Sequence, residues 1–129
     1  PQPLRWRSDI DASFTRGGFR LANDSLVVPA SGMYFVYFQA SFLGAACPAG
    51  DARLILAHRV LLFSDNYRRD VPLLSAHKVA CPGGAPWYRS LRQGAAFALQ
   101  EGDRLFTETE GETHLCPDRG SLSFGAFAL

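Results

Sequence analysis

Residues 31–42, SGMYFVYFQASF, decide the fold, because this stretch is apolar on both sides of an extended chain. Alternate side chains of a β-strand point to opposite faces of the sheet. One face carries Tyr34, Val36, Phe38, Ala40 and Phe42, and the other carries Met33, Phe35, Tyr37, Gln39 and Ser41. A strand in a sandwich normally buries one face and exposes the other to water. The second apolar face therefore predicts a covering surface, and the simplest cover is another copy of the chain.

Length and composition indicate one all-β domain. The chain has 129 residues, 47% of them hydrophobic and ten of them Phe, with 12 Gly and 8 Pro scattered between apolar runs. This content excludes disorder and favours many short strands joined by turns. The net charge of +1 and the absence of long basic runs give no footprint for nucleic acid. No apolar run reaches the 18 residues that a membrane-spanning helix requires.

Strand-like runs recur about every ten residues, which fits a sandwich or barrel. The expected strands cover 19–21, 26–28, 31–42, 53–63, 71–79, 90–99, 104–110 and 122–129, with a hairpin turn at 100–103. Polar or Gly- and Pro-rich loops are expected at 44–51, 64–70, 81–86 and 111–120. No segment has a sustained 3.6-residue apolar period, so we expect no long helix.

No combination of residues predicts an active site. The chain lacks the nucleophile-elbow, metalloprotease and phosphate-loop motifs. Its histidines are His58, His77 and His114, and the two in expected strands are interpreted as packed or hydrogen-bonded residues. The acidic pairs are Glu101 with Asp103 in a turn and Glu108 with Glu110 on a strand. We interpret both pairs as solubilising groups, and we expect no enzyme activity, cofactor, metal or small-molecule substrate.

The three cysteines permit one disulfide and one spare thiol. Cys47 and Cys81 lie in two loops and each precedes Pro, whereas Cys116 lies in a polar loop. The first two are either unrelated free thiols or a disulfide that ties the loops together. Such a crosslink would stabilise the fold by about 3–4 kcal/mol. Asn23 begins an Asn-Asp-Ser glycosylation sequon, which matters only in a secretory compartment.

Tyr67 is the one aromatic residue in the charged loop SDNYRRD, residues 64–70. Its ring either packs back onto the sandwich or anchors an interface, a role that suits Tyr because it offers a large area at low entropic cost. The residues alone leave these two interpretations open.

Four long motifs carry a family resemblance. They are LVVPASGMYFVYFQASF at 26–42, VPLLSAHK at 71–78, PWYRSLRQGAAFALQEGDRL at 86–105 and FGAFAL at 124–129. In this order they resemble the tumour necrosis factor superfamily, in its tumour necrosis factor and lymphotoxin-alpha branch, over residues 4–129. The resemblance implies one domain over 1–129. Its fold would be a jelly-roll β-sandwich of two antiparallel sheets that assembles as a compact homotrimer.

The resemblance also implies a function without chemistry. Family members are extracellular cytokines, secreted or shed from type II membrane precursors. They bind cysteine-rich receptors of the tumour necrosis factor receptor family in grooves between subunits. Clustering of these receptors triggers inflammatory, immune and cell-death signalling. We expect a membrane anchor, a stalk and the first family strand to precede Pro1. The alternatives are a recognition head of the complement or collagen-associated type and, less favoured, a cupin-type metalloenzyme.

Specific positions follow from the same resemblance. The implied trimer-interface residues are Phe35, Tyr37, Arg92, Phe97, Ser123, Phe127 and Leu129. The implied receptor-binding residues are Tyr67, Arg7, Asp9, Asp11, Leu115 and Asp118. A Cys47–Cys81 disulfide and a glycan on Asn23 are implied as well. Arg92 and Ser123 stand where tumour necrosis factor has tyrosines near the threefold axis. Three like charges there destabilise the assembly unless they are paired or hydrated, so we expect Arg92 to reach solvent or an acidic partner.

Overall fold

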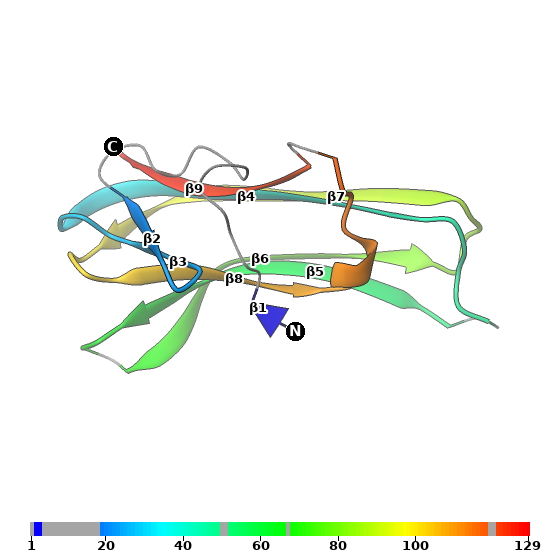
Figure 1. Cartoon of the computed structure of the whole chain (residues 1–129), viewed down its shortest axis with the longest axis horizontal. Coiled ribbons are helices and arrows are strands. Elements are labelled where there is room, and N and C mark those ends of the chain that lie inside the picture. The colour runs from blue at the N-terminus through cyan, green and yellow to red at the C-terminus, as the bar shows by residue number, and fades with distance from the viewer. Residues whose placement is uncertain (1, 4–18, 50–51, 67, 119–120) are drawn as a thin grey trace.

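Two antiparallel sheets stacked face to face form the molecule (Figure 1). The structure is a computed structural model, and it describes residues 2–3, 19–49, 52–66, 68–118 and 121–129. Within these ranges the only helical element is a short 3-10 turn, η2 (Glu112–His114). The predicted all-β sandwich and the absence of a long helix among the described residues are thus confirmed.

The smaller sheet holds the strand from which the sequence argument started. Its strands are β4 (Gly32–Gly44), β7 (Trp87–Leu99) and β9 (Leu122–Ala128), in the order β7-β4-β9. β4 is the central strand, and it pairs with β7 along its whole length from Gly32 opposite Leu99 to Gly44 opposite Trp87. These strands form the upper layer in Figure 1.

The larger sheet forms the lower layer of Figure 1. Its strands are β2 (Arg20–Ala22), β3 (Ser25–Val27), β8 (Arg104–Glu110), β5 (Leu54–Ser64) and β6 (Arg69–Cys81), in the order β2-β3-β8-β5-β6. The short β1 (Gln2–Pro3) pairs with β8 beside this path. The hairpin of β5 and β6 projects beyond the sandwich at the lower left of the figure.

Two strands are longer than the sequence predicted. β6 begins at Arg69, inside the expected loop 64–70, and continues to Cys81, and β7 begins at Trp87, three residues before the expected start at 90. The partner strands explain the difference, because Arg69 lies opposite Ser64 and Trp87 lies opposite Gly44. Backbone hydrogen bonds to a neighbour stabilise extended chain even where the local residues favour a turn.

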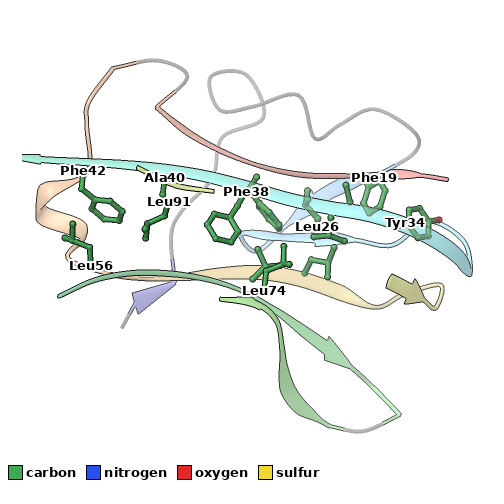
Figure 2. Packing of buried hydrophobic residues seen from close by; sticks show 14 of the residues in the cluster. Phe19, Leu26, Tyr34, Phe38, Ala40, Phe42, Leu56, Leu74 and Leu91 are labelled. Atoms are coloured by element: carbon green, nitrogen blue, oxygen red, sulfur yellow. The ribbon is translucent and has the colours of Figure 1, made fainter. Parts of the chain in front are cut away.

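The core lies between the sheets, where the alternation of β4 predicted it (Figure 2). The inward side chains of β4 are all buried: Tyr34, Val36, Phe38, Ala40 and Phe42. From the larger sheet Leu26, Leu56 and Leu105 meet them, each with no exposed surface. Large apolar side chains of this kind stabilise the fold by about 1.5–3 kcal/mol each when fully buried.

The structure shows the bonding state of all three cysteines. Cys47 and Cys81 form a disulfide with a Cα–Cα distance of 5.9 Å, as predicted, and Cys116 is a free, buried cysteine.

The interpretation of Asp103 as a solubilising group is wrong, because this residue is buried. Its carboxylate accepts a hydrogen bond of 2.9 Å from the backbone N–H of Gln100 and closes the β7–β8 turn.

Candidate functional site

The outward side of the β7-β4-β9 sheet exposes an unusual amount of apolar surface. Five of the seven exposed large hydrophobic side chains of the described residues extend from this side of the sheet. We call this surface the exposed sheet face and define it by Met33, Phe35, Tyr37, Gln39, Leu43, Tyr88, Arg92, Ser123, Phe127 and Leu129. Clustered exposed apolar residues on a folded domain mark an interaction site.

An aromatic cluster forms the centre of this face. The rings of Phe35 and Phe127 lie 5.4 Å apart between centroids, and those of Tyr37 and Phe127 lie 6.3 Å apart. Glycine makes room for two of the rings. A Cβ atom on Gly94 would come within 2.7 Å of the Phe35 ring, and one on Gly125 within 2.8 Å of the Tyr37 ring. The two rings therefore lie against glycine backbone, in space that a larger residue would take from them.

A polar row crosses the same face next to the aromatic cluster. Gln39 on β4 lies opposite Arg92 on β7 and opposite Ser123 on β9. These three residues, together with Phe35 and Tyr37, help to line an open cavity of about 480 Å³. Arg92 is exposed, and no ion pair of Arg92 is found within the described residues. The single chain thus leaves this guanidinium in contact with solvent, whereas its surroundings in an assembly stay a prediction.

The structure does not bring all the predicted interface residues together. Phe97 lies opposite the buried Tyr34, so it points to the core side of the sheet, where it is half-buried against the hydrophobic cluster. Leu129 follows β9 and is 69% exposed, and its backbone N–H donates to the carbonyl of Met33. The sequence interpretation missed Leu43 and Tyr88, which face each other across β4 and β7 and are both exposed.

Most of the predicted receptor-binding residues cannot be placed. Tyr67, Arg7, Asp9 and Asp11 lie outside the described residues. Leu115 and Asp118 follow η2 in one segment, but only Asp118 is exposed. Leu115 is half-buried and forms a bridge with Phe42 of β4. Its side chain packs against the hydrophobic core cluster, so this packing and the backbone bridge together anchor the loop on the sandwich.

The three histidines occupy different environments. His58 is fully buried on β5, as predicted, with its Nδ1 atom 2.8 Å from the Thr109 hydroxyl and its ring 4.7 Å from that of Phe38. Its Nε2 atom has no hydrogen-bond partner. Burial, with a smaller contribution from the adjacent Arg59, lowers the pKa of His58 to about 4. His77, contrary to the prediction of a packed residue, is exposed on β6.

The His114 ring lies tilted beside the Trp87 ring, with a centroid distance of 5.2 Å and an interplanar angle of 56°. A cupin-type metalloenzyme would need His and Glu ligands gathered on adjacent strands. Within the described ranges, no group of three or more His, Cys, Asp or Glu side chains could hold a metal ion.

Burial also affects the remaining free thiol. Desolvation raises the pKa of Cys116, and the nearby Asp118 carboxylate acts in the same direction. A thiol in this environment stays protonated and is a poor nucleophile near neutral pH.

In the described part of the chain, no helix has the length and apolar character needed to cross a membrane.

Comparison with known proteins gives a consistent result. The model of the TNF (Tumour Necrosis Factor) family matches residues 4–129. The chain is 53% identical to lymphotoxin-alpha of Sus scrofa over 132 residues, covering 100% of this chain and 65% of that protein. It is 54% identical to lymphotoxin-alpha of Oryctolagus cuniculus, covering 98% and 66%. It is 49% identical to lymphotoxin-alpha of Homo sapiens, covering 98% and 63%. The chain thus spans slightly less than two thirds of the length of these relatives.

Proposed function

Since the chain belongs to the tumour necrosis factor family, we propose that it is an extracellular cytokine that acts as a homotrimer. The trimer binds cysteine-rich ectodomains of the tumour necrosis factor receptor family in the grooves between its subunits. Gathering several receptors on one trimer then triggers inflammatory, immune and cell-death signalling. No bond is made or broken in this function, so it depends on geometry and on multivalent binding.

The exposed sheet face is the observation that carries this proposal. Its centre is aromatic, and Phe127 is 49% exposed and Met33 48% exposed in the single chain. Interface centres are enriched in aromatic residues and Met and depleted in charge, as this face is. A second copy of the same chain is the partner always present at matching concentration, and closed cyclic symmetry is the usual form of such assemblies. The family supplies the expectation that the number of copies is three.

Receptor recognition is assigned to the edges that the trimer leaves exposed. Tyr67 stands in the charged loop between β5 and β6, where the resemblance implies a receptor contact. Asp118 is exposed after η2 and is the second proposed contact. A Tyr of this kind is a typical hot-spot residue, because its ring buries much area while its hydroxyl keeps a hydrogen bond.

The location follows from the cysteine chemistry and the family. Disulfides form and persist in oxidising compartments, so the Cys47–Cys81 bridge supports an extracellular site of action. We propose that the protein is secreted, or shed from a type II membrane precursor.

A receptor-binding assay tests the proposal. Purified trimer is titrated against immobilised ectodomains of the receptor family, together with the variants Tyr67→Ala and Lys78→Ala. Lys78 is exposed near the far end of β6 from this loop and serves as the matched control. We expect at least one ectodomain to bind, with affinity reduced by about tenfold or more in Tyr67→Ala and unchanged in Lys78→Ala. Absence of binding to every ectodomain at micromolar concentration would contradict the proposed function.

A further inference from the structure

We propose that the trimer binds one tetrahedral oxyanion, of the phosphate or sulfate class, between the three copies of Arg92. This inference rests on the proposed trimer. It concerns the polar row of Gln39, Arg92 and Ser123, which crosses the otherwise apolar exposed sheet face.

Arg92 is isolated among apolar groups. No Asp or Glu occurs in β4, β7 or β9, so none of the strands that form this face supplies a counter-charge. The other Arg of β7, Arg89, turns away and donates to the carbonyls of Tyr88, Val79 and Ala80. Arg92 is therefore the one charged side chain that the described strands place on this face.

Covering the face changes the energetics of this charge. In the single chain the Arg92 side chain is exposed to water, so the guanidinium keeps its hydration free energy. In the proposed trimer, where the resemblance puts Arg92 near the threefold axis, three guanidinium groups would approach one another in a water-poor interface, and repulsion and desolvation would both oppose assembly. A bound anion removes both penalties, since it supplies negative charge and accepts the hydrogen bonds that water no longer makes.

The space and the donors fit a small oxyanion. Each chain contributes a cavity of about 480 Å³, which Arg92 lines together with Gln39 and Ser123. The Gln39 amide and the Ser123 hydroxyl are neutral donors directly across the ladder from the Arg92 position. The side chain of the neighbouring Gln93 is held towards β6, because its oxygen accepts a hydrogen bond of 2.9 Å from the backbone N–H of Ser75.

Symmetry selects the shape of the ligand. Phosphate and sulfate each have a threefold axis, so three of their oxygens can meet three equivalent guanidinium groups at once. Arg presents parallel N–H donors that match two oxygens of one oxyanion. Chloride has a single charge and no such array of acceptors, so we expect it to bind more weakly.

The test is a calorimetric titration of the purified protein with inorganic phosphate, at an ionic strength held constant with sodium chloride. We expect a stoichiometry of one phosphate to three chains, competition by sulfate, and a melting temperature that rises with phosphate concentration. Arg92→Gln should lower the phosphate affinity by about tenfold or more. Arg104→Gln, the same change at an exposed position on the other sheet, should leave it unaltered.

The outcomes separate this inference from the trimer itself. Light scattering on the same samples reports the mass, so a monomer would overturn the proposed trimer and the site with it. A trimer that binds no phosphate, binds one per chain, or binds equally well as Arg92→Gln would overturn the anion site alone. A crystal structure with an acidic side chain of a neighbouring subunit against Arg92 would also overturn it.

Discussion

His58 makes the stability of this sandwich depend on pH. The imidazole is fully buried between the sheets, and its Nε2 atom faces no hydrogen-bond acceptor. Protonation would place a positive charge in the core with only the Thr109 hydroxyl beside it. The folded protein therefore strongly favours the neutral ring.

The magnitude follows from the pKa. In the unfolded chain His has its ordinary pKa of 6.5, whereas burial lowers the folded value to about 4. A lowered pKa means that the unfolded state binds the proton first as the pH falls. The His58 contribution is thus complete above pH 6.5 and is lost as the pH falls to about 4. Each pH unit of difference corresponds to 1.36 kcal/mol, so the loss is about 3 kcal/mol per chain.

Denaturant unfolding at fixed protein concentration, repeated between pH 7 and pH 4, measures this loss. Carboxylates also titrate in this range, so the informative quantity is the difference between the native chain and His58→Leu. We expect the variant to lose about 3 kcal/mol less than the native chain over the interval. It should be slightly destabilised at pH 7, since Thr109 loses a hydrogen bond. His77→Gln, at an exposed site, should keep the native profile, and equal pH profiles for His58→Leu and the native chain would refute the reasoning.

Three further predictions concern the exposed sheet face, the disulfide and the sequon. Gly125→Ala places a Cβ atom within 2.8 Å of the Tyr37 ring, so it should displace the ring and weaken association of the proposed trimer by about tenfold or more in sedimentation. Gly32→Ala, whose added Cβ atom has no contact closer than 4.0 Å, should leave the association unchanged. Cys47→Ala should lower the free energy of unfolding by about 3–4 kcal/mol in a denaturant titration, because it opens a crosslink between residues 34 apart in sequence. Asn23 is exposed in the β2–β3 turn, with a φ of 50°, so the sequon is accessible for glycosylation. Protein secreted from mammalian cells should therefore lose mass on enzymatic deglycosylation, whereas the Asn23→Gln variant should not.

The sequence predicted the layers of the fold well because burial in a sandwich follows the two-residue period of a strand. This period alone places Phe38 in the core and Tyr37 on the opposite face. Phe97 follows the same period and lies on the core side of the sheet. It shares its parity with Leu91 and Leu99, both buried, so alternation within β7 already indicated the core side.

Other features depend on contacts between distant parts of the chain. The extension of β7 back to Trp87 depends on β4 as its neighbour, because residues 87–89 directly follow a Gly- and Pro-rich loop and have no strand signal of their own. The burial of Asp103 depends on how its turn closes against the sandwich, and the sequence offers only a polar turn residue. The size of the cavity beside Arg92 likewise depends on the register of three strands.

We expect other copies of the chain to cover the exposed sheet face. The most direct test is the mass of the protein in solution, measured by light scattering after size exclusion at low micromolar concentration. We expect about 42 kDa for the unglycosylated protein, the mass of three chains of 14.1 kDa. A stable monomer of 14.1 kDa under the same conditions would contradict it.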